Sequence, residues 1–67
     1  MMTLTVNGQK HELVVTRTVR DLVAELGLGG AAVAVELNQQ LVPHRRYETT
    51  TLNDGDTLEI VTLVGGG

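Results

Sequence analysis

Hydrophobic and polar residues alternate near the start of the chain, with the period of two that is typical of β-strands. The alternation over residues 3–6 runs into an Asn-Gly pair at 7–8, which supplies the positive φ angles of a two-residue hairpin turn. It resumes over 10–15, where Leu13 and Val15 should share the buried side of a second strand. The pattern therefore predicts an antiparallel hairpin at the beginning of the fold.

The apolar residues then change to helical spacing and form one stripe, at Val19, Leu22, Val23 and Leu26. Thr18 lies three positions before Asp21, so its hydroxyl and the Asp21 carboxylate can cap the first turn of a helix. Gly27 suits the left-handed position that follows the last turn. We expect a short helix over 19–26 that is stable only when its stripe packs on the sheet.

Alternation returns beyond the helix and predicts further strands. A strand over 33–37 leads through a turn at 38–39 into a short strand over 40–42, with a proline directly after it. An Asn-Asp-Gly-Asp turn at 53–56 precedes a run of β-forming residues over 57–63. The residues between these two groups carry no pattern that predicts an element.

These elements predict a two-layer α+β domain of order ββαββ, in which a single helix covers one face of a mixed sheet. A chain of 67 residues can form only one small core. Tyr47 is its only aromatic residue, so Leu, Val and Ile must fill that core. We expect the domain to span residues 1–64 and the glycines at 65–67 to form a flexible tail.

Composition excludes several classes of function. Five basic against eight acidic residues give a net charge of −3, which disfavours the phosphate contacts of nucleic-acid binding. Cysteine is absent, so the chain offers no disulfide, thiolate metal site or cysteine nucleophile. No stretch approaches the ~18 apolar residues of a membrane span, and the start of the chain lacks the pattern of a signal peptide. We expect a cytoplasmic protein that binds neither nucleic acid nor a membrane.

Candidate catalytic and metal-ligating residues are few. His11 and His44 have no Cys, Asp or His at metal-ligand spacing. Asp54 and Asp56 belong to the predicted turn, and two carboxylates without further oxygen donors do not make a calcium site. Asp21 is explained by the start of the helix. The sequence therefore predicts no catalytic residue, no metal site and no bound cofactor, and the chain is not expected to be an enzyme.

Several segments resemble known small carriers when taken together. The order ββαββ is the β-grasp arrangement seen in ubiquitin. The Asp-Gly-Asp at 54–56, the β-rich run over 57–63 and the glycine end resemble the last strand and tail of ubiquitin-like carriers. The segments 33–38 and 41–43 resemble the central part of the thiamine sulfur carriers, the ThiS family. These matches cover nearly the whole chain in the family's order.

The resemblance implies a function for the carboxylate of Gly67. In the family, an activating enzyme adenylates the terminal carboxylate with ATP, and sulfur then displaces AMP to leave a thiocarboxylate. That sulfur is donated to form the thiazole moiety of thiamine. The implied partners are an E1-like adenylating enzyme of the ThiF type, a thiazole synthase of the ThiG type and a sulfur donor protein. ATP belongs to the activating enzyme, and the free carrier is expected to be a monomer.

The glycines before Gly67 suit a tail that enters another protein's active site. Gly65 and Gly66 give the tail a narrow profile and access to φ angles that a Cβ would close. A glycine at position 65 departs from the usual pattern of the family, since it makes the end of the chain a triple glycine. It leaves the reactive end intact and removes the contact that a side chain there would make.

The last strand predicts where partners dock. If Leu58 and Ile60 face the helix, alternation places the residues between and after them on the opposite face of the sheet. Ubiquitin-like proteins present this face to activating enzymes. An exposed apolar centre flanked by acidic residues is a reasonable docking surface. The residues expected to form it are Ala34, Glu36, Glu59, Val61, Leu63 and Val64.

Other functions remain open from the residues alone. A sulfur carrier for molybdopterin or for tRNA thiolation would use the same tail chemistry with another acceptor, although molybdopterin carriers tend to be longer and this chain has no Phe. A ubiquitin-like modifier would join Gly67 to lysines of other proteins. In a passive β-grasp interaction domain, the tail would have no function.

Overall fold

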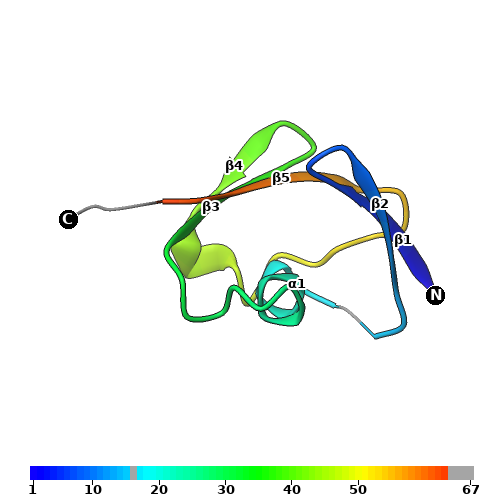
Figure 1. Cartoon of the computed structure of the whole chain (residues 1–67), viewed down its shortest axis with the longest axis horizontal. Helices are drawn as coiled ribbons and strands as arrows, with labels where there is room; N and C mark the ends of the chain where they lie inside the picture. Colours follow the sequence, from blue (N-terminus) through cyan, green and yellow to red (C-terminus); the bar gives the residue numbers. More distant parts are fainter. Residues whose placement is uncertain (16, 64–67) are drawn as a thin grey trace.

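A computed structural model of the chain describes residues 1–15 and 17–63. The elements follow the order β1 (Met2–Val6), β2 (Gln9–Leu13), α1 (Val19–Glu25), β3 (Val33–Leu37), β4 (Gln40–Val42), the 3₁₀ helix η1 (His44–Arg46) and β5 (Thr57–Thr62). Figure 1 shows the strands as one layer with α1 beneath it. The predicted α+β architecture, a mixed sheet with a single helix on one face, is confirmed.

The strands form one five-stranded sheet in the order β2-β1-β5-β3-β4. Neighbouring strands pair antiparallel except β1 and β5, which pair parallel in the middle of the sheet. The short β4, the strand predicted over 40–42, supplies one edge of the sheet and is the fifth strand, which the order ββαββ leaves out. The last strand, β5, therefore lies between the first hairpin and the second, where both hairpins hold it.

The core lies between α1 and the inner face of the sheet. Its largest fully buried side chains are Leu4, Val19, Leu22, Val35 and Leu58. Their transfer from water is the main favourable contribution to folding, of about 1.5–3 kcal/mol for each side chain. Since the helix is only seven residues long, this packing is what stabilises it.

Both predicted two-residue turns are present with the backbone angles that they require. Asn7 and Gly8 have φ angles of 51° and 79°, and Asn38 and Gln39 have φ angles of 50° and 70°. Positive φ at both central positions matches the turn to the right-handed twist of the two strands. Gly27 has a φ of 79° and ends α1 as predicted.

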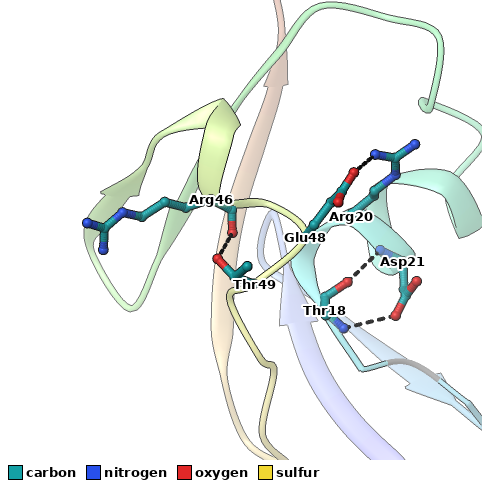
Figure 2. Close-up of polar contacts among 6 residues, drawn as sticks. All are labelled: Thr18, Arg20, Asp21, Arg46, Glu48 and Thr49. Carbon is teal, nitrogen blue, oxygen red and sulfur yellow. Dashed lines mark hydrogen bonds and ion pairs between the residues drawn. The ribbon is translucent and has the colours of Figure 1, made fainter.

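The start of α1 carries the predicted capping box (Figure 2). The Thr18 Oγ1 accepts from the Asp21 amide at 3.2 Å, and the Asp21 carboxylate accepts from the Thr18 amide at 3.1 Å. Two amides at the helix start thus find acceptors within four residues of sequence.

The segment 44–52, for which the sequence predicts no element, completes the start of the helix. The Thr50 carbonyl accepts from the Val19 amide and the Tyr47 carbonyl from the Arg20 amide, both at 3.0 Å. Arg20 also pairs with Glu48 across this junction (Figure 2). Tyr47 and Leu52 turn inward and join the core. The segment is therefore a fixed part of the domain.

The second strand is shorter than predicted. β2 ends at Leu13, and Val14 and Val15 are 81% and 68% exposed, so the expectation that Val15 shares the buried side with Leu13 is wrong. The reason lies in the register, since Leu13 pairs with Met2, where β1 begins. Beyond Leu13 the chain has no strand to pair with and bends toward the helix.

Candidate functional site

The outer face of the sheet, turned away from α1, holds most of the residues predicted to bind a partner. Leu58 and Ile60 are buried against the helix side, as predicted, so Glu59 and Val61 point outward between and after them. Leu63 follows β5 and is 57% exposed, and its amide donates to the Ala32 carbonyl at 2.9 Å, which extends the pairing of β5 with β3.

The strand register brings these residues into one group. Ala34 of β3 lies opposite Val61 of β5, and Glu36 lies opposite Glu59. On the other side of β3, Glu36 lies opposite Leu41 of β4. We call the set Ala34, Glu36, Leu41, Glu59 and Val61 the outer patch.

Leu41 is a member that the sequence analysis did not name. It is 68% exposed, while its neighbour Val42 is buried in the core. The signal was present in the chain, because alternation within 40–42 places Leu41 outward once Val42 is inward. Its position next to Glu36 depends on the pairing of β4 with β3, which the sequence does not give directly.

The outer patch is hollowed. Its five side chains line a depression of about 270 Å³. Ala34 is the smallest of them and lies on the central strand of the three, with Leu41 and Val61 on the strands to either side. The patch thus combines apolar walls with two carboxylates in a space that one side chain of a partner can enter.

The other half of the outer face is different in character. Inward Leu4, Val6 and Leu13 leave small polar and charged residues pointing outward from β1 and β2. These outward residues are Thr3, Thr5, Lys10 and Glu12. Among the described residues of the strands, the exposed apolar side chains of the outer face therefore lie in the half built from β5, β3 and β4.

The last strand ends in this apolar half. β5 ends at Thr62 beside Val33, where β3 begins, and Figure 1 shows this end of the sheet pointing away from the N-terminus. The predicted anchor Val64, the threading glycines Gly65 and Gly66, and the acceptor Gly67 lie outside the described residues. The last described residue, Leu63, joins the outer patch to them.

Three further residues with polar or titratable groups have structural partners. Asp54 accepts from the Thr3 amide at 2.6 Å, and Asp56 accepts from the Asn53 amide at 2.8 Å, so the predicted turn is confirmed. The Tyr47 hydroxyl donates to the Val33 carbonyl at 3.1 Å, and burial raises the pKa of this hydroxyl. Within residues 1–15 and 17–63, no three His, Asp or Glu side chains gather as they would around a metal ion.

A second hollow, of about 460 Å³, lies between α1 and the segment 44–52. Arg20 at its edge is paired with Glu48. The Tyr47 ring contacts that of His44, with their centroids 4.9 Å apart. These contacts explain the hollow as the junction of the helix with η1.

No helix in the described part of the chain is long and apolar enough to cross a membrane.

A single helix on a mixed sheet, with the last strand in the centre and one uncovered apolar face beside its end, defines a ubiquitin-like β-grasp protein. Comparison with known proteins gives the family. The ThiS family matches residues 4–67, and the chain belongs to it. Sulfur carrier proteins named ThiS, from Bacillus subtilis and Escherichia coli, are among the relatives that it resembles.

Individual relatives agree with this assignment. The sulfur carrier protein ThiS of Bacillus subtilis is 42% identical over 52 residues, which are 78% of this chain and 79% of that protein. The crystal structure of the thiamine biosynthesis protein ThiS from Geobacter metallireducens superposes with a TM-score of 0.82 at 35% identity, covering 98% of this chain and 100% of that one.

A relative of another kind is a thiazole synthase of Paramagnetospirillum magneticum. It is 44% identical over 66 residues, which are 98% of this chain but 20% of the synthase. The chain therefore spans a fifth of the length of this relative.

Proposed function

We propose that the chain carries sulfur as a thiocarboxylate on Gly67 and donates it to formation of the thiazole moiety of thiamine. The observation that carries this proposal is the family match, which runs through residue 67. The absence of cysteine supports it, because sulfur cannot then be held as a protein persulfide on this chain.

The chemistry requires an activated carboxylate. A carboxylate is a poor acyl donor, and attack of its oxygen on ATP gives a mixed anhydride with AMP while pyrophosphate leaves. A sulfur nucleophile then forms a bond to the acyl carbon as AMP departs. The carrier supplies only the acyl group, and ATP with its metal ion is bound by the activating enzyme. Gly67 is thus a substrate position for that enzyme.

The activating enzyme, of the ThiF type, is proposed to dock on the outer patch and on Leu63 and Val64 beyond it. This surface combines apolar side chains with an acidic rim, as protein interfaces do. Val61 is 56% exposed and lies one residue before the end of β5, so a protein bound there has the tail within reach. Gly65 and Gly66 would thread into its active site.

The proposed acceptor is a thiazole synthase of the ThiG type. The similarity to a segment of the Paramagnetospirillum magneticum thiazole synthase supports this choice over a molybdopterin or tRNA acceptor. A sulfur donor protein and the cytoplasmic location stay predictions. A protein modifier and a passive interaction domain stay alternatives, and the following experiment separates them.

The test is to incubate the purified chain with a ThiF-type enzyme, ATP and sulfide, and to measure its intact mass. Replacement of one oxygen by sulfur is the expected result. A chain extended by one residue after Gly67 serves as the matched control and should fold normally but remain unmodified. No change of mass with an enzyme that loads another ThiS protein would contradict the proposal. Glycine remnants on lysines of other proteins would favour the modifier.

A further inference from the structure

Two like charges face each other in the outer patch. Glu36 and Glu59 are direct partners in the pairing of β3 with β5, and both are exposed. Like charges directly opposite on neighbouring strands destabilise a sheet. Neither carboxylate has an ion pair with any described residue, since the salt bridge of this part of the chain joins Arg20 to Glu48. The free carrier thus keeps an unfavourable pair of charges side by side in its outer patch.

The surroundings of this pair match a long cationic side chain. Leu41 and Val61 give the hollow apolar walls, and Ala34 leaves room between them. Lysine and arginine side chains pack an aliphatic stem along apolar surface and place the charge at its end. A guanidinium presents several N–H donors in one plane, so it can bond to two neighbouring carboxylates at once.

Other charges on the outer face are arranged differently. Glu12 points outward from β2 opposite Thr3, and Lys10 is two residues before it on the same strand. The acidic residue of that half therefore has a neighbour of opposite charge nearby. The unbalanced pair of carboxylates is confined, among the described outward residues of the sheet, to the half built from β5, β3 and β4.

We propose that the hollow of the outer patch receives a cationic side chain of the activating enzyme, best matched by arginine, which bridges Glu36 and Glu59. This proposal rests on the proposed function and adds the chemistry of recognition to it. Repulsion between the two carboxylates destabilises the free carrier, and a cation of the partner removes this repulsion in the complex. The two carboxylates therefore select a partner with a positive charge at this point.

The experiment compares sulfur loading of the wild-type chain with that of a Glu36→Gln, Glu59→Gln double variant. Carrier concentration is varied at low and high salt with sulfide as the sulfur source. We expect the KM for the carrier to rise about tenfold with kcat unchanged, and its dependence on salt to weaken. The control is Glu12→Gln, which removes one carboxylate from the other half of the same face and should load as wild type.

Thermal unfolding of the same variants shows whether a rise in KM comes from a loss of folded protein. Relief of repulsion should leave the double variant at least as stable as wild type. A KM equal to that of wild type, or an equal rise in the Glu12→Gln control, would overturn the proposal. Normal loading with weaker transfer to a thiazole synthase would assign the hollow to the acceptor and overturn it as well. Failure of the wild-type chain itself to load would instead refute the proposed function.

Discussion

The side chain of Asn7 forms two hydrogen bonds with the backbone of Ile60, 53 positions away. Its Nδ2 donates to the Ile60 carbonyl at 2.9 Å, and its Oδ1 accepts from the Ile60 amide at 2.7 Å. β1 ends one residue earlier, at Val6, so the amide group continues the pairing of β5 where the strand has turned away. One residue thus shapes the first hairpin and holds the strand that leads to the tail.

Substitutions at Asn7 should separate these two roles. Asn7→Gly tolerates the φ of 51° but loses both hydrogen bonds, and we expect a loss of about 1–2 kcal/mol in the free energy of unfolding. Asn7→Ala loses the same bonds and adds backbone strain, so its loss should be larger by about 1 kcal/mol. Urea unfolding measures both. A glycine variant as stable as wild type would show that the bonds to Ile60 contribute nothing.

The capping box makes a local prediction. Thr18→Ala removes the acceptor for the Asp21 amide and should lower the free energy of unfolding by about 1 kcal/mol. Thr49→Ala is the matched control, because its exposed hydroxyl donates at 3.3 Å to the Arg46 carbonyl, which also accepts from the Thr50 hydroxyl, and takes no part in the start of α1 (Figure 2). It should change stability by less than about 0.5 kcal/mol. Equal effects of the two substitutions, again in urea, would contradict the role of the cap.

Tyr47 predicts how stability depends on pH. Burial raises its pKa above the ordinary value of 10.0, so above about pH 10 the unfolded chain loses the phenolic proton while the folded chain keeps it. Ionisation then favours the unfolded state, and the free energy of unfolding should fall as pH rises through this range. Tyr47→Phe is less stable at neutral pH because the Val33 carbonyl loses its donor, but it should lack this part of the alkaline decline. Parallel curves for the two proteins above pH 10 would contradict the prediction.

The short second strand gives a contrast between neighbours. Val15→Ser should change stability by less than about 0.5 kcal/mol, because the side chain is already in water. Leu13→Ala should cost about 2–4 kcal/mol, because it leaves a cavity in the core. Thermal or urea unfolding of both proteins checks the difference. A large loss for Val15→Ser would mean that the strand extends as the alternation alone suggested.

The features that the sequence predicted well depend on neighbours in the chain. Each of these features involves residues within a few positions of one another, so a short stretch of sequence is enough to predict it. They are the two turns, the cap between Thr18 and Asp21, and the helical stripe. Alternation in β5 likewise predicted which of its residues face outward, because side chains on a strand must alternate.

The features that the sequence missed depend on contacts between distant segments. Alternation favoured Val15 as a buried residue, but the position where β1 begins limits β2 to Leu13. Tyr47 and Leu52 enter the core because their segment packs on the start of α1, and no periodic pattern marks them. Leu41 belongs to the outer patch because β4 pairs with β3, and this pairing is not encoded in a local pattern.

The central claim concerns one atom of Gly67, and fragmentation mass spectrometry of the loaded chain tests it most directly. After reaction with the activating enzyme, ATP and sulfide, we expect sulfur in place of oxygen in fragments that contain Gly67, and in no fragment that ends before it. The wild-type chain treated without ATP provides the baseline. Sulfur on any other residue, or an unmodified Gly67 with an enzyme active on another ThiS protein, would contradict the account.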